Sequence, residues 1–161
     1  MISKTIAVKK ARSINNTQIP ARDGKAHGGI KRSNRHPNCT YFTNWTSTTD
    51  KITFDVNVVE AGVFEVEIYY TCPVDSIGAT FQLICGSNKL QAKITEAHDP
   101  PTRGQKEDRI VRVESYVKDF KPLKIGHIKV DKGPTTLTLK ALSIPGQQVM
   151  EFRLLMITRL K

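Results

Sequence analysis

The stretch KITFDVNVVEAGVFEVEIYY, residues 51 to 70, decides the fold class of this chain. Apolar side chains occupy every second position from Ile52 to Val58 and again from Phe64 to Tyr70. Such alternation is typical of strands that bury one face. Glu60, Ala61 and Gly62 lie between the two runs and favour a turn, so the stretch predicts two antiparallel strands joined as a hairpin.

Short alternating segments continue to the end of the chain, separated by turn-forming GSN, DKGP and IPGQ. They predict six more strands, over residues 79–85, 89–94, 109–116, 123–130, 135–142 and 149–160. No segment keeps an apolar period near 3.6 residues over about ten positions, which disfavours crossover helices and a parallel sheet. We therefore expect an all-β fold, an antiparallel β-sandwich of the jelly-roll type.

The longest interruption, TEAHDPPTRGQKED at residues 95–108, contains adjacent prolines and six charged residues. Two prolines exclude a central strand, so the segment is expected to be a surface loop. Loops of this length are often functional, but these prolines could equally stiffen a crossover between the sheets.

The N-terminal part differs in composition from the rest. The chain has 161 residues and a net charge of +10, and nine Lys or Arg stand against the single acid Asp23 in residues 1–40. We expect a basic arm over residues 1–44 and one sandwich domain over residues 45–161. The arm either binds a polyanion or an acidic protein surface, through Arg22, Lys31, Arg32 and Arg35, or is a solvated linker.

Catalytic motifs are missing from the sequence. There is no phosphate-binding loop, no dinucleotide fingerprint and no HExxH zinc motif, and no nucleophile can be matched with a base. The three cysteines lack a Cys-x-x-Cys pair, which disfavours a thiolate zinc site. Cys72 and Cys85 fall in expected strands and favour buried free thiols, although one disulfide stays open.

Two rings and one loop are the candidate binding residues. Trp45 and Tyr116 could stack on a sugar, with Tyr69 as a further ring, whereas a buried Trp45 would anchor the arm onto the core. Glu96, His98, Asp99 and Arg103 could contact hydroxyl or sulfate groups. The oxygens among them would also suit a structural calcium ion, or these charges are simply solvated.

Several long segments resemble, in order, the C-terminal region of bacterial arylsulfatase-type enzymes of polysaccharide-degrading, planctomycete-like bacteria. They include IPARDGKAHGGIKRS, PNCTYFTNWTSTTDKITFDV, IYYTCPVDSIGATF, KITEAHDPP, ESYVKDFKPLKIG and LTLKALSIPGQQVMEFRLL, and they extend from Ile19 to the end. The resemblance implies a galactose-binding-like jelly roll placed after a sulfatase catalytic domain, and a periplasmic or extracellular location.

The catalytic motif of such sulfatases, Cys/Ser-x-Pro-x-Arg, is missing here. The segment most like it, Ser143-Ile144-Pro145-Gly146-Gln147, has glutamine in place of the required arginine. We therefore expect no catalysis from this chain and no required cofactor. The expected ligand is a carbohydrate, and a sulfated polysaccharide would suit the basic charge; the alternative is a structural domain that docks onto a catalytic domain or protein partner. Nucleic acid is disfavoured because aromatic residues are missing from the basic segment before Tyr41, and no stretch is apolar enough to span a membrane.

Overall fold

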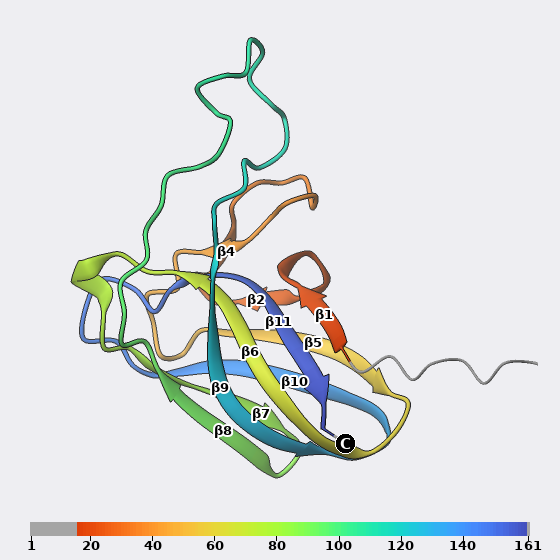
Figure 1. Ribbon diagram of the computed structural model, residues 1–161. Helices are drawn as coiled ribbons and strands as arrows, with labels where there is room; N and C mark the ends of the chain where they lie inside the picture. The colour runs from red at the N-terminus through yellow and green to blue at the C-terminus, as the bar shows by residue number, and fades with distance from the viewer. Residues whose placement is uncertain (1–15, 161) are drawn as a thin grey trace, which may run out of the picture.

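The computed structural model describes residues 16–160, which form two antiparallel sheets stacked face to face (Figure 1). The strands of the six-stranded sheet, in spatial order, are β3 (Lys31–Arg32), β4 (Phe42–Thr43), β11 (Glu151–Arg159), β6 (Gly62–Thr71) and β9 (Lys121–Val130), with β1 (Asn16–Pro20) also paired to β11. Those of the five-stranded sheet are β2 (Lys25–His27), β5 (Lys51–Val58), β10 (Gly133–Ser143), β7 (Thr80–Cys85) and β8 (Asn88–Lys93). Short 3-10 turns cover Ala21–Asp23 and Val74–Ser76. The prediction of an all-β jelly-roll sandwich is confirmed.

The two strands of the 51–70 stretch do not pair with each other. β5 pairs with β2 and β10, whereas β6 pairs with β11 and β9 in the opposite sheet. The predicted hairpin is therefore wrong, and the turn before Gly62 carries the chain from one sheet to the other. Both kinds of connection bury every second side chain, so alternation alone cannot distinguish them.

The core lies between the sheets and explains the alternation. Ile52, Phe54 and Leu139 point inward from the five-stranded sheet, and Ile68 and Phe152 point inward from the six-stranded sheet, all at most 1 % exposed. The rings of Phe54 and Phe152 lie 5.9 Å apart, centroid to centroid. Inter-sheet contacts of this kind hold the two layers at a fixed spacing.

Residues 16–44 belong to the sandwich and are not an extended arm. β1 adds to β11, β2 adds to β5, and β3 joins β11 through β4. Ala21, Ile30 and Phe42 from this segment are buried. Apolar periodicity missed these strands because they have two to five residues each, too few to show a period. Residues 1–15 of the expected arm lie outside the described residues.

The segment between β8 and β9 is a single long loop. The predicted strand over residues 109–116 is wrong: the backbone there is bent and pairs with neither sheet. Figure 1 shows this green-to-teal loop rising away from the sheets, beside the orange loop between β3 and β4. Ile110 and Val111 are each 82 % exposed, so the alternating pattern lacks the buried surface that would make it a strand.

Candidate functional site

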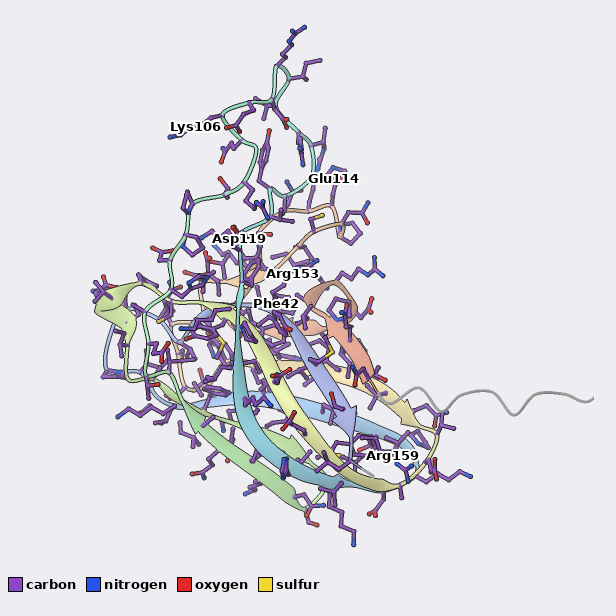
Figure 2. The ribbon with its side chains drawn as sticks, in the orientation of Figure 1. Phe42, Lys106, Glu114, Asp119, Arg153 and Arg159 are labelled. Atoms are coloured by element: carbon purple, nitrogen blue, oxygen red, sulfur yellow. The ribbon has the colours of Figure 1, made fainter. Side chains whose placement is uncertain are left out.

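A shallow pocket of about 220 Å³ lies between the two loops that rise from the same end of the sandwich. One wall comes from the β3–β4 loop and the other from the β8–β9 loop. Its lining residues are Ser33, Asn34, Tyr41, Thr102, Arg112, Glu114, Ser115 and Tyr116. In Figure 2, Lys106 and Glu114 lie on the raised part of the long loop and Asp119 lies where that loop rejoins the body.

Hydrogen bonds between the two loops fix the walls of the pocket. Asn34 Nδ2 donates to the carbonyl of Val113 at 2.8 Å, and the hydroxyls of Ser33 and Ser115 lie 2.7 Å apart. Asn38 Nδ2 donates to Glu114 Oε1 at 2.9 Å. The bonded residues lie 76 to 82 positions apart in the sequence. Through these bonds the β3–β4 loop supports the longer β8–β9 loop.

Tyr116 is held in place by its neighbour Arg112. The Arg112 guanidinium lies 4.9 Å from the ring centroid, and the backbone N–H of Arg112 donates to the Tyr116 hydroxyl at 3.2 Å. Arg112 Nε donates to Asp108 Oδ2 at 2.6 Å. Hydrogen bonds from Arg112 and Tyr116 lower the pKa of Asp108, and the bond to Asp108 raises the pKa of Arg112. Both groups are therefore charged at neutral pH.

The base of the long loop is attached to the sheet by ion pairs. Lys118 Nζ lies 2.6 Å from Glu151 Oε2 on β11, and both side chains are about 15 % exposed. Arg103 Nη1 lies 2.9 Å from Asp119 Oδ1. Lys118 also lies 5.7 Å from the ring of Tyr41, which is buried and lines the pocket. These contacts connect the pocket to the rigid part of the fold.

The two candidate rings have different environments. Tyr116 lines the pocket and is half-buried, so it stays a candidate binding residue. Trp45 is only 1 % exposed and is part of the core, so the prediction that it stacks on a sugar is wrong and the anchoring alternative holds. Its backbone carbonyl accepts a hydrogen bond from Val149 N–H, which ties residue 45 to the segment that precedes β11.

The acidic loop residues do not gather in the pocket. Glu96 forms an ion pair with Lys121, and Asp99 lies 3.8 Å from Lys118. The His98 ring bonds to the carbonyl of Asp119. Arg103 also contacts Asp119, through the carboxylate of that residue. Within residues 16–160 no three His, Cys, Asp or Glu side chains lie close enough to share a metal ion, so the acidic side chains of this loop do not form a cluster of their own, and a structural calcium ion here stays a prediction.

The four basic candidates do not form one anion site. Arg32 donates three hydrogen bonds to backbone carbonyls and is fully engaged. Arg22 faces Asp23 at 3.5 Å. Arg35 Nε donates to the ring of His36, and Lys31 is exposed on β3. The excess of basic residues in this segment is therefore partly structural.

The Cys72 thiol is not activated as a nucleophile. Burial first, then the charges of Asp75 and Asp99, raise the pKa of the Cys72 thiol to about 11, so it is protonated at neutral pH. Cys72 and His98 are bridged only through their backbones. All three cysteines are free, and Cys72 and Cys85 are buried, which confirms the interpretation as buried thiols.

No helix among residues 16–160 is long and apolar enough to cross a membrane.

Sequence reasoning missed several pocket residues. Asn34 and Tyr41 fall in the segment assigned to the arm, and Arg112 and Glu114 fall in the predicted strand. Both wrong assignments hid that the two segments face each other. The available signal was the three asparagines of residues 33–44, because asparagine favours loops that bond to neighbouring backbone.

Comparison with known proteins shows the fold. No protein-family model matches the sequence, and the comparison with curated proteins finds no match. Among solved structures, the C-terminal CBM6 of the laminarinase LamC from Zobellia galactanivorans is 13 % identical, with a TM-score of 0.61, and the match covers 90 % of this chain and 100 % of that one. The CBM6 module of lichenase 5A from Cellvibrio mixtus, in complex with cellotriose, is 10 % identical, with a TM-score of 0.59 and coverage of 90 % and 98 %.

A larger enzyme also matches. The GH26-CBM35 β-(1,4)-mannanase of Podospora anserina is 12 % identical, with a TM-score of 0.62; the match covers 91 % of this chain but only 28 % of that enzyme. This chain therefore spans about a quarter of the mannanase and nearly all of the isolated modules. The chain has the jelly-roll fold seen in carbohydrate-binding modules.

Proposed function

We propose that this chain is a non-catalytic carbohydrate-binding accessory domain and that its glycan site is the pocket between the β3–β4 and β8–β9 loops. The observation that carries the proposal is the Tyr116 ring beside the polar groups of Asn34, Arg112 and Glu114 in one pocket. A ring that covers an apolar sugar face, with donors and acceptors around it for hydroxyls, is how proteins bind sugars.

The size of the pocket limits what enters it. Its volume of about 220 Å³ lies below the roughly 300 Å³ at which pockets for whole drug-sized ligands begin. We infer that it takes one sugar unit of a longer glycan, with the rest of the glycan outside.

Two finer proposals concern the parent protein and the ligand. The domain follows a sulfatase or glycosidase catalytic domain, and its ligand is a sulfated polysaccharide. The sequence resemblance and the charge of +10 support them.

Isothermal titration of the full chain against cellotriose, laminari-oligosaccharides and sulfated galactan oligosaccharides tests the glycan proposal. We expect saturable binding to at least one of them, weakened about tenfold in Tyr116→Ala, because a stacked aromatic ring contributes about 1 kcal/mol or more. Tyr69→Ala is the matched control: Tyr69 is also half-buried but pairs with Pro122 on the six-stranded sheet, away from the pocket. Equal losses in both variants, or no binding to any of the glycans, would contradict the proposal.

The exposed tip of the long loop supports a second candidate function, docking onto a protein partner. Ile110, Val111 and Val113 are 82 %, 82 % and 61 % exposed, an unusual density of bare apolar residues for a surface loop. The partner would be a catalytic domain of the same or another chain. If glycan titration is silent and Val111→Ser with Val113→Ser abolishes association with such a domain, docking is the better description.

A further inference from the structure

The outward face of the five-stranded sheet carries an unusual pair of lysines. Lys51 on β5 and Lys140 on β10 are directly opposite in the register of these two strands. Their neighbours Ile52 and Leu139 point into the core, so both lysines point to solvent, and both are exposed. Like charges directly opposite on paired strands disfavour the fold by a few tenths to about 1 kcal/mol.

Asp55 is the one carboxylate on the described strands of this face, too few to neutralise its lysines. Among the described residues, Lys51, Lys140 and the two β8 lysines, Lys89 and Lys93, have no Asp or Glu within ion-pair distance, and the one pair on this face joins Lys25 to Asp55 at 3.0 Å. The other sheet differs. There, Lys124 meets Glu65 at 3.3 Å, Arg159 meets Glu60 at 3.1 Å and Lys121 meets Glu96.

Protection of a sheet edge explains only part of this charge. β8 is an edge strand, and lysines such as Lys89 and Lys93 commonly prevent edge strands from pairing with other chains. β5 and β10 are interior strands with partners on both sides. Lys51 and Lys140 therefore protect no edge, and edge protection does not explain why two like charges stand opposite each other on paired strands.

Hydrogen-bonding groups continue the row on both sides of the lysine pair. Gln82, in register with Lys140, is only 9 % exposed, but Gln91, in register with Gln82, is exposed. On the other side, His27 is in register with Lys51. The outward positions of this sheet carry no Trp, Tyr or Phe, so the face has cations and amides but no ring for a neutral sugar.

We propose that the outward face of the five-stranded sheet is a second binding site, which takes an anionic polysaccharide through contacts of Lys51 and Lys140 with its sulfate or carboxylate groups. The exposed side chains of Gln91 and His27 extend the contacts along the glycan. The choice of a polysaccharide over other polyanions rests on the proposed carbohydrate function; the cationic face itself does not.

Titration with dextran sulfate, at physiological salt and with unsulfated dextran as reference, tests the site. The variant Lys51→Gln/Lys140→Gln should bind dextran sulfate about tenfold more weakly, since two cations next to the polyanion are lost. Lys124→Gln/Lys129→Gln is the matched control: it removes the same charge from β9 of the other sheet and should change affinity less than about twofold. Thr53 and Thr138 form the next outward-facing pair after Lys51 and Lys140 on the same two strands. Their amide signals should shift in nuclear magnetic resonance spectra when dextran sulfate is added.

Three results would overturn the proposal. Equal weakening in the two double variants would mean that binding follows net charge alone, and no binding of dextran sulfate would leave the face without its ligand. Binding of duplex DNA with the same affinity and the same sensitivity to Lys51→Gln/Lys140→Gln would exclude a polysaccharide-specific site. Tyr116→Ala should leave dextran sulfate binding unchanged, so failure of the pocket and failure of this face are distinguishable. An unchanged or higher melting temperature in Lys51→Gln/Lys140→Gln would show that the fold is intact.

Discussion

Arg32 fastens the N-terminal segment to the sandwich. Its guanidinium donates to the carbonyls of Ala21 at 2.9 Å, Arg22 at 3.1 Å and Gly24 at 2.7 Å, and lies 5.0 Å from the centroid of the Phe42 ring. Arg32→Lys keeps the charge but cannot reach three acceptors, so we expect a loss of about 1–3 kcal/mol in the free energy of unfolding, measured by urea denaturation.

The control for that prediction is Arg35→Lys, since Arg35 is exposed and its guanidinium bonds only to the neighbouring His36. It should change stability by less than about 0.5 kcal/mol. Similar losses in both variants would mean that the three carbonyl contacts of Arg32 contribute nothing measurable. At this scale the sequence supplied the charge of Arg32 but not its partners, because the carbonyls become acceptors only when the 3-10 turn at Ala21–Asp23 forms.

The ion pair between Lys118 and Glu151 attaches the long loop to strand β11. Burial disfavours the charged ammonium, but the hydrogen bond and charge of Glu151 outweigh it, and the pKa of Lys118 is raised above its ordinary 10.5. A raised pKa means that the folded state holds this proton more tightly, so the contribution to stability is complete below about pH 10 and is lost as the pH rises through the folded value.

Glu151→Gln should therefore lower the free energy of unfolding at neutral pH by about 1–3 kcal/mol, because it leaves a largely buried cation with only the more distant carboxylate of Asp99, at 3.8 Å. The difference between wild type and variant should shrink above about pH 10.5, where wild-type Lys118 begins to lose its charge. Chemical denaturation at a series of pH values measures both. Glu65→Gln, which breaks the exposed pair with Lys124, serves as control and should cost less than about 1 kcal/mol at every pH. A gap between wild type and Glu151→Gln that stays constant to the alkaline limit would argue against Lys118 as the titrating group.

The elements show where sequence patterns succeed. Seven of the eight predicted strands exist because each has a buried face that the alternation reports, as in β10 with Leu137, Leu139 and Ala141 inside. Residues 109–116 have the same pattern without a partner strand, so the pattern misleads. The pocket could not be predicted either, because its walls meet through contacts such as Asn34 to Val113, 79 residues apart in sequence.

The whole molecule depends on the N-terminal segment that its composition assigned to an arm. β1 and β4 pair with β11, β2 pairs with β5, and the buried side chains of Ala21, Ile30 and Phe42 fill part of the core. A high content of Lys, Arg, Asn and Gly is typical of linkers, but here Lys25 and Lys31 lie on short strands and Arg32 bonds to three backbone carbonyls. Charge composition thus misjudged the structure of this segment.

A chain that begins at Trp45 tests this dependence. It lacks four strands, and it leaves one side of β11 and of β5 unpaired and part of the core uncovered. Because a domain of this size is stable by only about 5–15 kcal/mol, we expect it to lose its cooperative thermal transition, whereas a chain that begins at Asn16 keeps every described strand and should retain the transition. Circular dichroism melting of the two chains makes the comparison. If the chain from Trp45 unfolds as cooperatively, and at the same temperature, as the chain from Asn16, residues 16–44 contribute nothing to the fold and are an arm after all.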